Sequence, residues 1–97
     1  MIKKIHNYKF ATNEYRLVHR PKSEPLLGYW ISEVWYDEEG RVVLYGDAAT
    51  PEGDIPDEAY ENICNMMKAF DNEPLNLDYV DYLLKVKWEN ERQSNTD

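Results

Sequence analysis

The sequence has few of the residues that build covalent or metal-bound sites. It contains one cysteine, Cys64, and two histidines, His6 and His19, among 97 residues. A single cysteine excludes an intramolecular disulfide and a cysteine zinc cluster, and it agrees with a reducing compartment. Neither histidine has a second ligand at the spacing that zinc sites use. We therefore expect no metal and no cofactor, and we expect Cys64 to be a small buried hydrophobic residue in a helix.

Long apolar runs and glycine-rich phosphate loops are also missing. No stretch approaches the roughly 20 apolar residues needed to span a bilayer. The basic start, residues 1–6, leads into no apolar signal core. No serine lies in a nucleophile-elbow context, and no glycine loop could cradle a phosphate. These absences predict a soluble cytoplasmic protein without a recognisable catalytic motif.

Positive charge is scarce, with 11 Lys and Arg against 19 Asp and Glu, for a net charge of -8. Residues 1–27 hold six basic and two acidic residues, a net of +4, whereas residues 28–97 hold five basic and seventeen acidic residues, a net of -12. An acidic surface repels nucleic-acid phosphates, so we expect no direct nucleic-acid binding. The same surface would attract a basic protein partner.

The clearest local pattern predicts a β-hairpin. Gly28–Tyr36 and Arg41–Tyr45 are rich in β-branched and aromatic residues, and Asp37–Gly40 separates them. An aspartate followed three residues later by a glycine is typical of a type I turn closed by a left-handed glycine. We therefore expect Gly40 to have a positive φ.

Shorter patterns flank the hairpin. Tyr15–His19 is rich in β-formers and is followed by Pro21, so it predicts a first strand. Thr12–Asn13 predicts a turn before that strand. Gly46–Gly53, which contains Pro51, predicts a loop after the hairpin.

Residues 55–70 predict an amphipathic helix. Asp54 is placed as the N-cap, Pro56 lies in the first turn, and Asp57 and Glu58 lie near the positive helix end. Its apolar residues fall on one stripe at helical spacing, which we expect to pack on the sheet. The stripe consists of Ile55, Ala59, Ile63, Met66, Met67 and Phe70.

The C-terminal segment from 75 to 88 fits two structures. Its apolar residues alternate as in a strand, and some also recur at helical spacing. We favour a helix because Asp78 and Asp81 lie early and Lys85 and Lys87 lie late, which suits the helix dipole. A strand remains the alternative.

These elements predict an α+β fold. We expect an antiparallel sheet of about three strands packed against one main helix, with a C-terminal helix or strand. The length predicts a single domain, 1–97, with its core in residues 15–88. Residues 89–97 contain no core formers, so we expect a frayed tail.

Two tryptophans raise the question of what covers the sheet. Trp30 and Trp35 are five residues apart, so in a regular strand they point to opposite faces. One helix covers only one face of a small sheet. The second face then needs the C-terminal segment, a second copy of the chain or another protein. A β-bulge would instead turn both rings to the same face.

We therefore expect a non-enzymatic, acidic binding or regulatory protein that acts through protein–protein contacts, with a homodimer as one of the arrangements. The expected contact residues are Trp30, Trp35, Tyr36 and Tyr45 on the sheet and Asp37, Glu38 and Glu39 at the hairpin tip.

Two other classes compete with this interpretation. One is a phage-type acidic inhibitor that imitates nucleic acid and binds a basic nuclease. The other is a small hydrolase, which would place His6 or His19 in a pocket beside Glu33 or Asp47.

The core pattern resembles a group of small uncharacterised bacterial and phage-borne proteins. The resemblance rests on the run Ile31 to Gly40, the loop Thr50 to Asp54, a helix ending at Met67–Phe70, and Pro74-Leu75. It covers roughly residues 15–77 and implies no activity.

The layout is also weakly similar to HicB-type antitoxins. Tyr36-Asp-Glu-Glu-Gly40, Pro51-Glu-Gly-Asp54 and Glu58-Ala59 match their turn, loop and acidic helix start. The similarity implies inhibition of a small RNase. Such antitoxins usually add a DNA-binding domain, and no ribbon-helix-helix or helix-turn-helix pattern is evident in this sequence.

Overall fold

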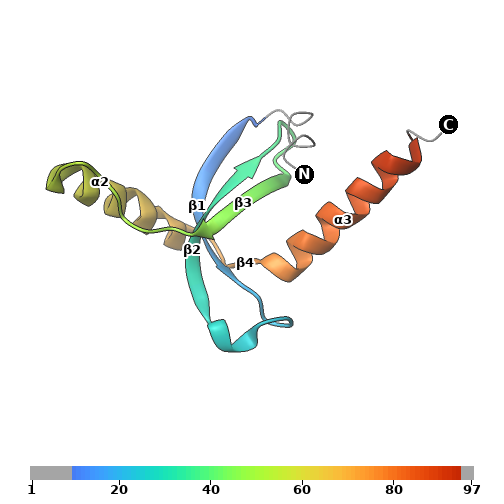
Figure 1. Ribbon diagram of the computed structural model, residues 1–97, viewed down its shortest axis with the longest axis horizontal. Helices are drawn as coiled ribbons and strands as arrows, with labels where there is room; N and C mark the ends of the chain where they lie inside the picture. Colours follow the sequence, from blue (N-terminus) through green and yellow to red (C-terminus); the bar gives the residue numbers. More distant parts are fainter. Residues whose placement is uncertain (1–9, 95–97) are drawn as a thin grey trace.

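The computed structural model describes residues 10–94, with side chains described through Asn90, and shows a curled four-stranded sheet that carries two helices (Figure 1). The strands are β1 (Thr12–His19), β2 (Tyr29–Tyr36), β3 (Val42–Ala48) and β4 (Leu75–Asn76). The helical elements are η1 (Pro25–Leu27), α2 (Pro56–Met67), η2 (Lys68–Asp71) and α3 (Leu77–Ser94).

The sheet is mixed and its strand order is β3-β2-β1-β4. β1 pairs antiparallel with β2, and β2 pairs antiparallel with β3. The short β4 lies parallel to β1 at the edge, with Leu75 opposite Val18. The predicted α+β class is therefore confirmed, while the prediction of about three antiparallel strands missed the two-residue parallel strand that leads into α3.

Two strand boundaries differ from the sequence prediction. The turn predicted at Thr12–Asn13 is wrong, because both residues pair with the end of β2 and extend β1. The loop predicted to begin at Gly46 is also wrong at its start, because β3 continues to Ala48. Register shifts place extra residues in β3 opposite β2, and such bulges let a strand continue through irregular pairing.

The hairpin turn matches its prediction. Gly40 has a φ of 80°, and its N–H donates to the Asp37 carbonyl at 3.0 Å. The Asp37 carboxylate accepts the backbone N–H groups of Glu39 and Arg41, both at 2.9 Å. An aspartate at the first position of a turn commonly satisfies these donors.

The helix predicted over 55–70 is present, with the last turn tightened into η2. Its N-cap is Ile55 and not Asp54, because the Ile55 carbonyl accepts the N–H groups of Glu58 and Ala59. The Asp54 backbone N–H instead donates to the Glu58 carboxylate at 2.9 Å. A residue whose own carbonyl accepts the first helical bonds occupies the cap, whichever neighbour has the better capping side chain.

The ambiguous C-terminal segment is a helix after its first two residues. α3 runs to Ser94, whereas the sequence led us to expect a frayed tail from Glu89. These residues include glutamate, arginine and glutamine, which have high helix propensity. Residues 95–97 lie outside the described residues, as do residues 1–9 with His6.

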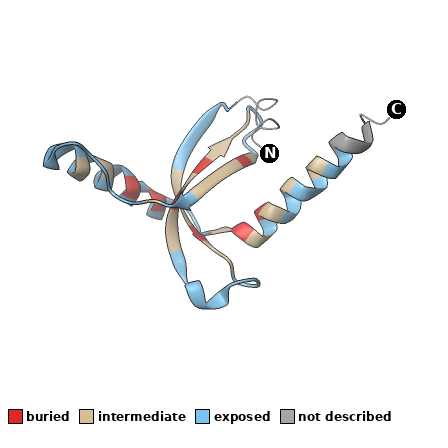
Figure 2. Ribbon diagram, in the orientation of Figure 1, coloured by how far each residue is buried: buried red, intermediate tan, exposed pale blue. Residues whose placement is uncertain are grey.

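The core is small and lies where the two helices meet the sheet (Figure 2). Its buried apolar residues are Val18, Val34, Val43, Met66, Ala69, Leu77 and Val80. Beyond this core, α2 and α3 project away from the sheet in different directions (Figure 1). The radius of gyration is 15.5 Å, whereas a compact domain of 100 residues has about 13 Å.

The extended shape leaves a large exposed surface. The chain exposes 7479 Å², whereas a compact monomer of its mass exposes about 5,800 Å². Among residues 10–94, no helix is long and apolar enough to cross a membrane.

Candidate protein-binding surfaces

The two tryptophans lie on opposite faces of the sheet. β1 and β2 pair without a register shift from Thr12–Tyr36 to His19–Tyr29, so the alternation along β2 is unbroken. Trp30 and Trp35 are both half-buried. The chain itself therefore covers part of each ring, and neither forms a large open patch.

The two tyrosines predicted as contact residues, Tyr36 and Tyr45, form hydrogen bonds within the chain through their hydroxyls. The Tyr36 hydroxyl accepts from Arg16 at 2.9 Å and donates to Glu14 at 2.6 Å. Burial, followed by the bond to Glu14, raises the pKa of Tyr36. Tyr36 therefore links β1 to β2.

Tyr45 belongs to a polar network with Arg20 and Asp81 that no sequence motif predicted. Arg20 follows β1 and donates to the Tyr45 hydroxyl at 2.6 Å and to the Asp81 carboxylate at 2.7 Å. The Tyr45 hydroxyl donates to the other Asp81 oxygen at 2.6 Å. The hydrogen bond with Asp81 raises the pKa of Arg20, so its guanidinium stays charged. The network joins three elements that are distant in the sequence.

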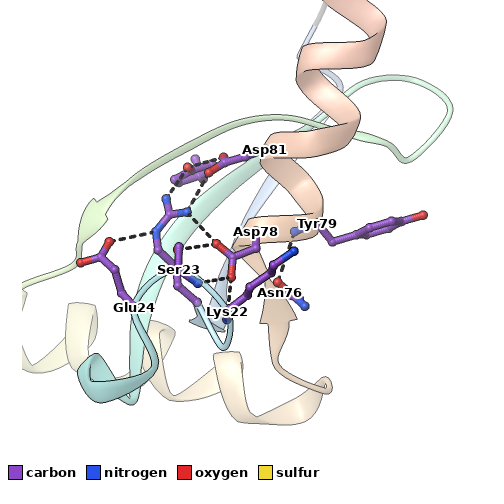
Figure 3. A network of polar contacts seen from close by, with 9 residues as sticks. Lys22, Ser23, Glu24, Asn76, Asp78, Tyr79 and Asp81 are labelled. Carbon is purple, nitrogen blue, oxygen red and sulfur yellow. Dashed lines mark hydrogen bonds and ion pairs between the residues drawn. The ribbon is translucent and has the colours of Figure 1, made fainter.

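A second carboxylate of α3 anchors the loop after β1. Asp78 accepts the backbone N–H groups of Lys22 and Ser23 at 2.9 and 3.1 Å, and it also accepts the Ser23 hydroxyl (Figure 3). Its carboxylate lies 3.7 Å from Arg20. The bond from the Ser23 hydroxyl is the main reason why the pKa of Asp78 is lowered. In the sequence, the only sign of this network is the pair Asp78 and Asp81, three residues apart. Their position near the positive end of the helix dipole already explained both.

The acidic side chains of the hairpin tip are partly engaged in contacts within the chain. Asp37 caps the turn and pairs with Arg41 at 3.1 Å. Glu39 also pairs with Arg41, at 2.9 Å, while Glu38 is exposed. Two of the three predicted acidic contact residues therefore share one arginine.

A shallow polar pocket of about 370 Å³ surrounds Glu33. It is lined by Asn13, Glu14, Tyr15, Glu33, Asn65, Lys68, Asp71 and Asn72. Glu33 accepts a hydrogen bond from Asn13 across the strand pair. His19, which the hydrolase alternative needed in such a pocket, does not line it and instead stacks on Tyr29 with ring centroids 4.8 Å apart. Among the described side chains, residues 10–90, no group of three or more histidine, cysteine, aspartate or glutamate residues is placed to hold a metal ion.

The apolar stripe predicted for the main helix is mostly uncovered. Met66 is buried as expected, but Ile55, Ile63, Met67 and Phe70 are exposed, and so is Cys64, which was expected to be buried. The reason is that the helix meets the sheet only near its C-terminal end and otherwise projects away from it (Figure 1). Met66 and Ala69 face the core, and an adjacent row of side chains has no cover.

We name this uncovered row the α2 stripe. It consists of Tyr60, Ile63, Met67 and Phe70, which follow one another at spacings of three, four and three residues. Tyr60 is 70% exposed and Phe70 is 64% exposed. The same helical segment carries exposed carboxylates from Asp57, Glu58, Glu61 and Asp71, together with one exposed lysine, Lys68.

A second row lies on the other helix, and we name it the α3 stripe. It consists of Tyr79, Tyr82, Leu83 and Val86, all exposed. Tyr79 points away from the polar network at the base of the helix (Figure 3). Both projecting helices thus present apolar side chains to solvent.

No protein-family model, curated protein or solved structure matches this chain, so the chemistry of these surfaces is what indicates the function.

Proposed function

We propose that this chain is a non-enzymatic acidic protein that binds a basic protein partner through the α2 stripe. The observation that carries this proposal is the row of four large exposed apolar side chains, Tyr60, Ile63, Met67 and Phe70, on one projecting helix. Contiguous exposed apolar patches are characteristic of interaction sites. The hydroxyls of Tyr36 and Tyr45 are occupied within the chain, so we assign binding to α2 rather than to the sheet.

The spacing of the α2 stripe suits a helix that docks in a groove. Side chains at intervals of three and four residues form one line along a helix, which is how amphipathic helices present their anchors to partners. Two of the four residues, Tyr60 and Phe70, are aromatic. Aromatic side chains commonly supply much of the binding energy of an interface.

The acidic residues of this helical segment favour a partner with positive charge. Four exposed carboxylates and one exposed lysine lie on the same helical segment, and the whole chain has a net charge of -8. A partner with basic residues around an apolar groove would gain from this field, while an acidic partner would be repelled. A small RNase, the target that the similarity to HicB-type antitoxins implies, is one basic protein of this kind. The single exposed thiol of Cys64 agrees with a reducing cytoplasm.

A pair of synthetic peptides tests the surface in place of the natural partner. Both are amphipathic 18-residue helices with a leucine face, one with a lysine polar face and the other with a glutamate polar face. We expect the lysine peptide to bind in calorimetry and the glutamate peptide to bind at least about tenfold more weakly. Met67→Glu should weaken binding of the lysine peptide by about tenfold, because it places a charge within the apolar row.

The matched control is Leu26→Glu, which makes the same charge change at a fully exposed residue of η1. It should leave binding of the lysine peptide unchanged. Equal binding of both peptides, or equal effects of the two substitutions, would show that the α2 stripe is not a binding surface for basic partners.

A further inference from the structure

α3 is a long helix with little support from its own sheet. Of its described side chains, only Leu77 and Val80 are buried, and both lie in its first turn. The remaining helix projects away from the sheet (Figure 1). Because isolated helices of this length are marginal in water, most helical stability in proteins comes from packing of an apolar face. The α3 stripe, with Tyr79 and Tyr82 59% and 61% exposed, is such a face without cover.

The exposed area is large enough for an interface here in addition to the one at α2. The chain exposes 7479 Å², roughly 1,600 Å² more than a compact monomer of its mass. A standard interface takes about 800 Å² from each partner. One interface of this size would cover about half of that difference.

The charges on α3 favour a copy of the same chain. Two molecules of net charge -8 repel each other unless they meet where charge is balanced. Asp78 and Asp81 are paired with Arg20 at the base of α3. Beside the stripe, Lys85 and Glu89 are exposed and opposite in sign. By contrast, a second copy at the α2 stripe would bring carboxylates against carboxylates.

We propose that a second copy of this chain packs on the α3 stripe, with the two α3 helices antiparallel about a two-fold axis between Tyr82 and Leu83. Tyr82 of each copy then faces Leu83 of the other, and Tyr79 faces Val86. In this arrangement Lys85 of each copy lies level with Val80 of the other, so the two lysines are about 7.5 Å apart along the helices, at 1.5 Å per residue. A parallel pair would instead place Lys85 against Lys85 and align the two dipoles.

This dimer stands independently of the partner proposed for α2, and the molar mass of the full chain tests it. Sedimentation velocity of the full chain should show a dimer at concentrations on the order of 10 µM. Leu83→Glu should weaken the dimer by at least about tenfold, because two carboxylates would meet near the two-fold axis. Leu26→Glu, the same change at a fully exposed site outside α3, should leave the dimer intact. Circular dichroism checks that each variant keeps its helices.

Disulfide trapping tests the orientation of the two helices. In a Cys64→Ser background, Tyr82→Cys should form a disulfide dimer under mild oxidation, because the two positions flank the axis. Tyr79→Cys should not, since antiparallel helices separate the two copies of this position by about 10 Å along the axis, at 1.5 Å per residue. Disulfides need Cα atoms within about 7 Å.

Three outcomes would overturn the proposal. They are a monomer throughout the concentration range, a dimer that Leu83→Glu leaves intact, and efficient trapping through Tyr79→Cys, which indicates a parallel pair.

Discussion

Tyr45 on β3 donates a 2.6 Å hydrogen bond to Asp81 on α3, across 36 residues of sequence. Arg20, which follows β1, completes a triangle by donating to both residues. The base of α3 is thus fixed to two strands by charge and hydroxyl contacts as well as by Leu77 and Val80. Small changes in these polar groups should therefore alter the stability of the whole fold.

Removal of Arg20 should destabilise the protein more than removal of another paired arginine. Arg20→Met removes the charged donor to Tyr45 and Asp81 and leaves Asp81 with the Tyr45 hydroxyl as its donor in this network. The Arg20 side chain is only 18% exposed. We expect a loss of about 1–3 kcal/mol in the free energy of unfolding, below the range for fully buried pairs because Asp81 is 45% exposed.

The matched control is Arg41→Met at the hairpin, where the arginine pairs with Asp37 and Glu39 but is 59% exposed. Exposed pairs contribute about 0–1 kcal/mol. Urea unfolding of both variants decides the question, and an equal loss would mean that the Arg20 network is no stronger than a surface ion pair.

Alkaline pH should destabilise the fold through two tyrosines. Burial is the main reason why the pKa values of Tyr36 and Tyr45 are raised, and hydrogen bonds to Glu14 and Asp81 add to the effect. A raised pKa favours the neutral hydroxyl in the folded state. Its stabilisation is therefore complete below the unfolded value of about 10 and is lost as pH rises through the folded value.

Ultraviolet titration of tyrosinate checks this expectation, with urea unfolding from pH 8 to 11 alongside it. Tyr45→Phe should remove one late-titrating tyrosine and flatten the alkaline loss of stability. If the titration curve of Tyr45→Phe lost an early-titrating group instead, the assignment to Tyr45 would be wrong.

Acid should act on the loop after β1 through Asp78. Its pKa is lowered, chiefly by the hydrogen bond from Ser23. A lowered pKa means that the stabilisation is present above the unfolded value of about 3.9 and is lost as pH falls through the folded value. Asp78→Asn should reduce the dependence of stability on pH below about 4, and Ser23→Ala should do so in part. Thermal unfolding between pH 2 and 5 measures the effect, and unchanged pH dependence in Asp78→Asn would refute it.

Gly53 should not tolerate a side chain. A Cβ atom there would lie 2.5 Å from the Ala59 backbone nitrogen and 2.6 Å from the Glu58 Cβ, at the first turn of α2. Gly53→Ala should therefore cost about 1–3 kcal/mol through displacement of the loop or the helix start. Gly46→Ala is the control, since its Cβ would meet Trp35 at an ordinary 3.9 Å. Chemical unfolding should show a loss for Gly53→Ala alone.

Local rules predicted the parts of the fold that depend on neighbouring residues. The turn at Asp37–Gly40 needs only an aspartate and a left-handed glycine, and both are observed. The main helix follows from its apolar periodicity. Thr12 and Asn13 look like a turn when taken alone, but their pairing with the far end of β2 makes them a strand. That pairing is a long-range contact, which local sequence does not encode.

The candidate surfaces were harder to predict for a different reason. Periodicity shows that a helix has an apolar side, but it does not show how much of that side the sheet covers. Met66 and Met67 are neighbours on the predicted stripe, yet one is buried and the other is 62% exposed. The Arg20 network likewise needs three elements to meet, so none of its members has a partner nearby in sequence.

The connection at β4, the joint between α3 and the sheet, determines how far the end of the helix moves when the helix rotates. Only Leu75 and Asn76 connect α3 to the sheet through backbone pairing, and the 18 residues of the helix extend about 27 Å from that point. A rotation of about 10° at this joint would move Ser94 by roughly 5 Å, at 1.5 Å of helix per residue. Asp81 is the residue of the Arg20 network that lies farthest along α3, and it is only about 6 Å from the start of the helix. For the same rotation, the tip of α3 therefore moves about four times as far as Asp81, so small motions at the base of the helix become large displacements at its end.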